Sequence, residues 1–176
     1  MSIMTFGQDK EMFNYINTYR VENGVDKLRW SKDLYVISKE HNDTLVSEDS
    51  LYHSKTNTYE NCGGSSTWTT PVTPTSLKEF NKFIDKYYNV TFDPNDTTEF
   101  NKFIKLSVIY AWSNSDGHNK NLLRDIKYGS VSTYVGEFTY IPNTKTVSLL
   151  GKTAVHKFDG ISPYYVGVVY STFNGD

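Results

Sequence analysis

The order of the predicted elements places this chain in the α+β class. Amphipathic helical patterns fill most of residues 8–113, and after residue 125 the pattern changes to period two with β-branched residues. Aromatic residues make up 15% of the 176 residues, so we expect them to supply much of the core. Helices followed by antiparallel strands predict a sheet covered by helices. The length suits one domain, residues 1–176.

Four helices are predicted from apolar residues at helical spacing. In the first of them, Met12, Phe13 and Ile16 lie on one face, and Gly24 follows as a stop signal. Ser31 is predicted to cap the second helix, because a serine hydroxyl can accept a hydrogen bond from the first turn. The predicted ranges are 8–22, 32–46, 76–88 and 98–113.

Three strands are predicted in the last third of the chain. Residues 128–141 and 164–173 alternate apolar and polar side chains, as a half-buried strand does. A turn at residues 142–145 lets residues 146–150 pair back onto the first strand, so a hairpin is expected there.

Residues 47–76 form the longest stretch without a helical or strand pattern, and we predict a functional loop there. The loop carries His53 and Glu60. Further along, the fourth helical pattern ends at Ser113, and Gly117 precedes His118 before a short second helix start. A histidine just past a helix end, on a bend that glycine permits, can be aimed across a cleft. We therefore predict that His53, Glu60 and His118 come together.

These three side chains allow more than one chemistry. Two imidazoles and a carboxylate could hold Zn²⁺ with a position open for water, or they could act as acid and base without a metal. No His-Glu-x-x-His or Cys-x-x-Cys motif is present, and no Gly-x-Ser-x-Gly elbow supports a serine nucleophile. His41 lies on the apolar face of the second helix, where a hydrogen-bonded core histidine is expected.

Composition excludes several function classes. The net charge of −2 offers no basic surface for nucleic acid. No apolar run approaches the roughly 18 residues that a transmembrane helix needs. Cys62 is the one cysteine, so an internal disulfide is impossible, and we expect an inert thiol. The first residues lack the charged and apolar regions of a signal peptide. Virion, cytoplasmic and, for a mature form, extracellular locations all stay open.

Five short segments, in order, resemble motifs of the CAP superfamily, which includes the cysteine-rich secretory, antigen 5 and pathogenesis-related proteins. Residues 16–24 resemble "N-x-x-R-x-x-x-G" and residues 28–34 resemble "L-x-W-x-x-x-L". Tyr52-His53-Ser54 is similar to the "F-S-H-S" loop, and Tyr59-Glu60-Asn61 is similar to "G-E-N". Residues 111–118 resemble the "W-x-x-S-x-G-H" of bacterial members. The resemblance spans residues 10–135 and fits a short bacterial or phage SCP-like type.

The resemblance implies a three-layer α-β-α sandwich with a central antiparallel sheet. It also implies a cleft lined by two histidines and two acidic residues, where several members bind a divalent metal. His53, Glu60 and His118 match three of the four positions, and Ser115 occupies the place of the second acid. On this basis His53 and His118 are the expected ligands of zinc or another divalent metal.

The incomplete set of site residues favours a non-enzymatic binding or interaction module. We expect it to act as a component of a larger extracellular or virion assembly, with a protein partner or a lipid or peptide ligand. The alternative is a metal-assisted hydrolase, a peptidase or an esterase, with His53, Glu60 and His118 as catalytic residues and Glu60 as the base.

Overall fold

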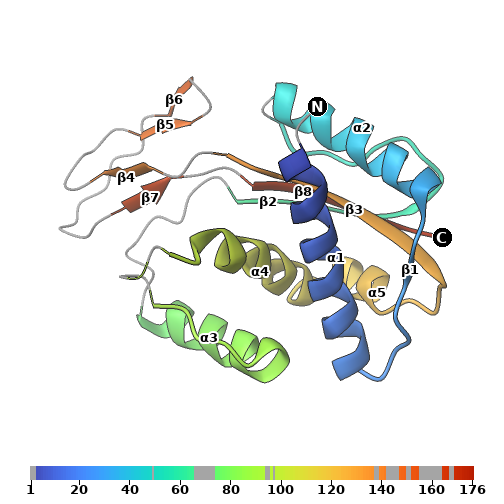
Figure 1. The fold of residues 1–176 in the computed structure, drawn as a ribbon, viewed down its shortest axis with the longest axis horizontal. Helices are drawn as coiled ribbons and strands as arrows, with labels where there is room; N and C mark the ends of the chain where they lie inside the picture. The colour runs from blue at the N-terminus through green and yellow to red at the C-terminus, as the bar shows by residue number, and fades with distance from the viewer. Residues whose placement is uncertain are drawn as a thin grey trace.

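The computed structural model contains a four-stranded sheet between layers of helices, which confirms the α+β class and the three-layer sandwich (Figure 1). It describes residues 3–48, 50–65, 74–93, 96, 98–136, 139–141, 147–149, 152–154, 164–166 and 169–176. The elements are α1 (Ile3–Glu22), β1 (Arg29–Trp30), α2 (Lys32–Glu48), β2 (Tyr59–Ser65), α3 (Pro74–Tyr88), α4 (Phe100–Ser113), α5 (Asp116–Leu122), β3 (Tyr128–Val135), β4 (Thr139–Ile141), β5 (Val147–Leu149), β6 (Lys152–Ala154), β7 (Tyr164–Val166) and β8 (Val169–Gly175).

The strands of the main sheet lie in the order β1-β3-β8-β2. Strand β8 pairs antiparallel with both β3 and β2, so the last strand of the chain lies in the middle of the sheet. The two-residue β1 pairs parallel with β3, which makes the sheet mixed at that end. Strand β2 is consequently an edge strand, and it pairs with β8 along only one side.

The two faces of the sheet differ in chemistry. On the face toward α1 and α4, Val131 and Phe173 pair across the strands and are fully buried in the main aromatic core. On the face toward α2, the buried side chains of β3 and β8 are small and polar. There, Ser38 bonds Ser130 at 2.8 Å between hydroxyl oxygens, and the Thr172 hydroxyl donates to the Ser38 carbonyl at 2.7 Å. Small hydroxyl-bearing residues allow α2 to lie close to the sheet.

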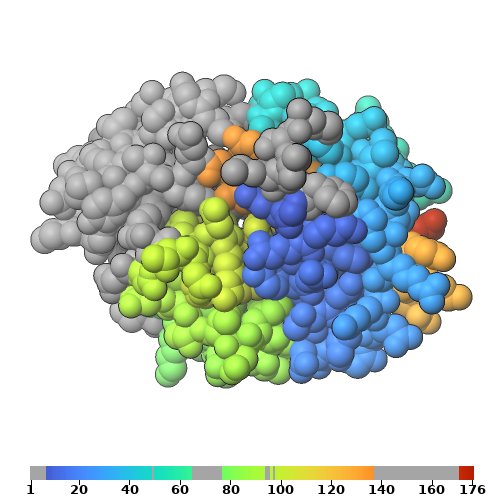
Figure 2. Space-filling model, in the orientation of Figure 1, coloured from blue at the N-terminus to red at the C-terminus, as the bar shows by residue number. Residues whose placement is uncertain are grey.

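The four predicted helices are confirmed within a few residues at each end. The Ser31 hydroxyl accepts a hydrogen bond from the Leu34 amide at 3.2 Å, as predicted for the cap of α2. The space-filling view shows α1 packed beside α3 and α4 over one face of the molecule (Figure 2). Aromatic side chains fill this contact, as the composition predicted; Tyr15 meets Tyr88 at 5.6 Å between ring centres, and Tyr19 meets Tyr87 at 4.9 Å.

The prediction of an irregular loop over residues 47–76 is wrong for residues 59–65, which form β2. Two glycines in the stretch hid the strand, because glycine is depleted in strands. The structure shows why Gly63 is there. A Cβ atom on Gly63 would lie 2.6 Å from Nε1 of Trp112 and 2.8 Å from Cγ1 of Val108, so only glycine lets α4 approach β2 this closely.

The predicted hairpin between residues 128–141 and 146–150 is also wrong. Strand β4 pairs with β7, and β5 pairs with β6 instead. The predicted turn at 142–145 lies outside the described residues. Alternation identified these segments as strands, but period two does not specify the partner of a strand.

We predict that Gly63→Ala lowers the free energy of unfolding by about 1–3 kcal/mol, the usual cost of overpacking a core. The added methyl group would collide with the buried indole of Trp112, which is 2% exposed. Urea unfolding of both proteins measures the difference.

Gly117→Ala is the matched control. Gly117 is exposed in α5, and its φ is not positive. A methyl group added there would meet no other atom within 4 Å. Alanine should stabilise this helix by about 0.5–1 kcal/mol. A Gly63→Ala protein as stable as the wild type would contradict the packing argument.

Candidate functional site

The free edge of β2 is covered by side chains from α4 and α5. Trp112 donates from Nε1 to the Cys62 carbonyl at 3.1 Å, and Asn121 donates from Nδ2 to the Glu60 carbonyl at 3.1 Å. An edge strand otherwise presents unpaired backbone groups. These two bonds satisfy two carbonyls on that side and fix both helices against the strand that carries Glu60.

Asn61 connects β2 to the histidine on α5. Its side chain donates to the His118 carbonyl at 2.9 Å and accepts from Asn121 at 3.0 Å. His118 lies past the end of α4, as the sequence predicted, but the next helix begins earlier than expected, at Asp116, so His118 is in the first turn of α5. The Ser115 hydroxyl lies 2.9 Å from His118 Nδ1 and so orients the ring.

The far end of α5 is held by a buried arginine on α1. Arg20 is 0% exposed and donates to four backbone carbonyls, those of Asp26 at 2.9 Å, Leu122 at 2.6 Å, Arg124 at 3.0 Å and Ile126 at 3.5 Å. The last carbonyls of a helix have no partner within the helix, so a guanidinium is well suited to satisfy them. Arg20 therefore fixes α5 along its axis.

Glu60 and His53 form the second half of the site. Oε1 of Glu60 accepts from the Ser54 amide at 2.8 Å and from the Cys62 thiol at 3.2 Å, and it lies 2.9 Å from His53 Nδ1. Burial alone would raise the pKa of this carboxyl. The hydrogen bonds from Ser54, Cys62 and His53 outweigh burial and hold the pKa of Glu60 below its usual value.

The structure brings the three predicted residues together. The rings of His53 and His118 face each other with centres 6.1 Å apart, and His53 is bonded to Glu60. The His53 side chain is 60% exposed, so the pair opens to solvent. Burial, and then the nearby His53, lowers the pKa of His118. Both effects favour the neutral form of His118.

A further group of potential ligands lies on the inner side of Glu60. One ligand atom from each of His41, Glu60 and Cys62 lies within 4.8 Å of the others, so the three could hold a metal ion. The prediction of His41 as a hydrogen-bonded core histidine is confirmed, since it is 9% exposed and bonded to the Tyr52 carbonyl. This group was not predicted from the sequence, because Glu60 and Cys62 share a face only within a strand.

Cys62 shows no feature of a nucleophile. It is 7% exposed, and burial followed by the nearby Glu60 carboxylate raises the pKa of its thiol. A thiol that keeps its proton at neutral pH is a poor nucleophile. This supports the expectation of an inert thiol.

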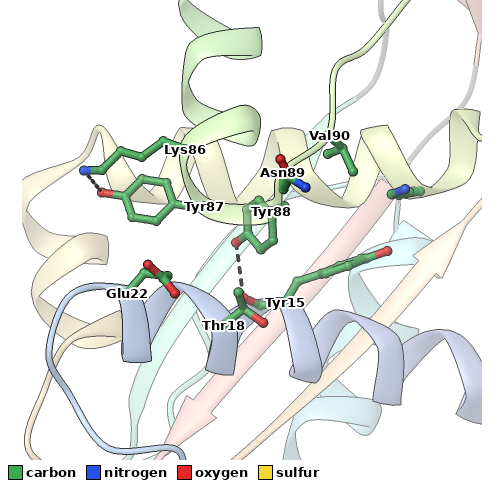
Figure 3. A pocket seen from close by; sticks show the side chains of 9 residues that line it. Tyr15, Thr18, Glu22, Lys86, Tyr87, Tyr88, Asn89 and Val90 are labelled. Carbon is green, nitrogen blue, oxygen red and sulfur yellow. Dashed lines mark hydrogen bonds between the residues drawn. The ribbon is translucent and has the colours of Figure 1, made fainter.

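A separate hollow of about 570 Å³ lies between α1, the end of α3 and α4 (Figure 3). Hydroxyl and charged groups surround it, with a Lys86–Tyr87 hydrogen bond of 2.8 Å on one side and Glu22 facing it from α1. Its lining does not form the large apolar wall that a lipid chain would require. The residues around it are Tyr15, Thr18, Glu22, Lys86, Tyr87, Tyr88, Asn89, Val90 and Lys102.

The fold and the edge-strand site are those of a small α-β-α domain with a pair of neighbouring histidines. A family model described as "CAP: Cysteine-rich secretory protein family" matches residues 13–137, well over half of the chain. This protein belongs to that family, as the five motifs indicated. No curated protein and no solved structure matches it. No helix among the described residues is long and apolar enough to cross a bilayer.

We predict that Glu60 makes stability depend on pH in the acid range. Because its pKa is lowered in the folded protein, its contribution is present above the ordinary carboxyl pKa of 4.5 and is lost as the pH falls through the lower folded value. Unfolding free energies of wild type and Glu60→Gln should therefore differ most near neutral pH, and the difference should shrink as the pH falls below 4.5.

Glu40→Gln, which changes an exposed carboxyl on α2, is the control for the loss of one negative charge. Denaturant unfolding at several pH values gives all three curves. A difference between wild type and Glu60→Gln that stays constant from pH 7 to pH 3 would show that the carboxylate form is not favoured by folding.

Proposed function

We propose that this CAP domain is a non-enzymatic binding module whose outer cleft, formed by His53 and His118, receives a group of its partner or a divalent metal. The observation that carries the proposal is that the Glu60 carboxylate is already engaged in hydrogen bonds to neighbouring groups. Its Oε1 atom accepts three hydrogen bonds, and its pKa is lowered, so the carboxylate orders the loop around His53 and is a weak base at neutral pH.

A serine-based mechanism is not supported either. Ser115 and His118 are 2.9 Å apart, but the contact spans three residues at the start of one helix and orients the ring. A nucleophile–base pair needs a third group that orients the base. Among the hydrogen bonds of the described residues, no carboxylate reaches His118, since Ser115 occupies that position.

The two imidazoles suit ligation better than proton transfer. Each ring uses Nδ1 for its contact with Glu60 or Ser115, so Nε2 of each remains for a ligand. The bond from His53 Nδ1 to a carboxylate is the usual arrangement behind a metal-bound histidine. The ring centres are 6.1 Å apart in a stacked arrangement, so a shared metal would require the rings to turn until both Nε2 lone pairs point at the ion.

The surface near the cleft favours a protein or peptide partner over a small metabolite. Leu51, Tyr52 and Tyr59 are 52%, 41% and 43% exposed and adjoin His53 and Glu60 in the chain. Tyrosines are enriched at protein interfaces because they combine a large apolar ring with a polar hydroxyl. Such a partner agrees with the expected place in a larger extracellular or virion assembly.

The proposal predicts metal or ligand binding at the cleft without turnover. In a titration with Ni²⁺ followed by NMR of the imidazole protons, the resonances of His53 and His118 should respond together. His118→Ala should weaken the response of His53 at least about tenfold, because one of the two ligands is lost.

Glu40→Gln, which changes an exposed residue on α2, is the control and should leave the response of His53 unchanged. Ester and peptide substrates are then offered to the wild type with zinc. Hydrolysis above the level of His118→Ala would overturn the non-enzymatic function in favour of the metal-assisted hydrolase.

A further inference from the structure

Three side chains converge behind the outer cleft, between α2 and β2. His41, Glu60 and Cys62 are 9%, 8% and 7% exposed, and one ligand atom of each lies within 4.8 Å of the others. Alternation along β2 directs Glu60 and Cys62 to the same face, the face that α2 covers, where Cys62 packs against Leu45. The group therefore lies in the interior, while His53 opens to solvent.

One atom of this group lacks a partner. Oε2 of Glu60 is buried, and the described residues offer it no hydrogen bond, whereas Oε1 accepts three. A buried carboxylate oxygen without a partner is costly, and in native proteins it marks an absent water, ion or ligand. Because the carboxylate is ionised, a cation is the occupant that would stabilise it most.

The protonation of His41 fits the same conclusion. Its Nε2 lies 2.8 Å from the Tyr52 carbonyl oxygen, which can only accept, so Nε2 carries the hydrogen. In the neutral ring the lone pair is then on Nδ1. A histidine that donates one ring N–H to a backbone carbonyl and keeps the other nitrogen for a metal is the common arrangement at metal sites.

We propose that His41, Glu60 and Cys62 form an inner zinc site, distinct from the outer pair of His53 and His118. Imidazole nitrogen, carboxylate oxygen and thiolate sulfur are the donors that Zn²⁺ binds. A sulfur donor excludes Mg²⁺ and Ca²⁺, which take oxygen ligands. The carboxylate and the thiolate together neutralise the charge of the ion, so a buried site carries no net charge.

Binding requires little change in structure. At Zn–ligand distances of about 2.0–2.3 Å, the ligand atoms of a tetrahedral site lie roughly 3.5 Å apart. The three ligand atoms now lie within 4.8 Å of one another, so their separations would need to shorten by about 1 Å at most. The proton of the Cys62 thiol passes to solvent, and its hydrogen bond to Oε1 is replaced by the metal–sulfur bond. Oε1 keeps its contacts with His53 and Ser54, and a fourth position is left for water.

Cobalt is the probe for this site, because Co²⁺ replaces zinc and reports its ligands by absorption. The full chain is titrated with CoCl₂ in the presence of a thiol-free reductant. We expect one equivalent to produce a sulfur-to-cobalt charge-transfer band in the near ultraviolet, which zinc then abolishes. Cys62→Ser should remove the band, and His41→Gln should weaken cobalt binding at least about tenfold.

His118→Ala is the matched variant, because its ring contacts Ser115 and none of the three inner ligands. It should keep the band. Circular dichroism of each variant with EDTA checks folding, and His41→Gln still tests the site if Cys62→Ser does not fold. Cobalt binding without a sulfur band, binding that Cys62→Ser leaves unchanged, or no binding by the wild type would overturn the inner site. The nickel titration tests the outer pair of His53 and His118 separately, so the inner site can fail while the outer site stands.

Discussion

The buried guanidinium of Arg20 is the interaction on which the geometry of the site depends. It donates to the carbonyl of Leu122 at the end of α5, to carbonyls just after that helix, and to the Asp26 carbonyl in the link after α1. Nearby, Asn17 accepts from the Leu28 amide at 2.7 Å and donates to the Leu28 carbonyl at 3.1 Å. A buried charge is tolerated only when its donors are paired, so these carbonyls cannot move far from α1.

This constraint reaches the cleft through a short series of contacts. With the end of α5 fixed by Arg20, Asn121 and Asn61 join the helix to the edge of β2, and Ser115 orients the His118 ring at the other end. Strand β2 is held in turn by β8, which lies between it and β3. The position of one imidazole is thus set by residues about a hundred positions apart in the chain.

The sequence allowed the helices and the outer site to be predicted, but not the strand that connects them. Helical spacing is a local property, so α1 to α4 could be placed within a few residues, and ordered motifs brought His53, Glu60 and His118 together. Strand β2 was missed because Gly63 is present for contact with Trp112, which is far away in sequence. Pairing with β8 is equally non-local, and no local pattern specifies it.

Because β2 was not predicted, the group formed by His41, Glu60 and Cys62 could not be predicted either. Glu60 and Cys62 face α2 only when the segment is extended, and His41 comes close only when α2 lies on that face. In the structure, the two oxygens of Glu60 differ in role, since Oε1 holds His53 and Oε2 is unpaired in the interior. With Ser115 in place of a second acid, the outer cleft has no other nearby carboxylate among its described contacts. Under the proposed inner site, metal binding would ionise the Cys62 thiol and add a second negative charge beside Glu60, so a soft divalent cation should prefer that side.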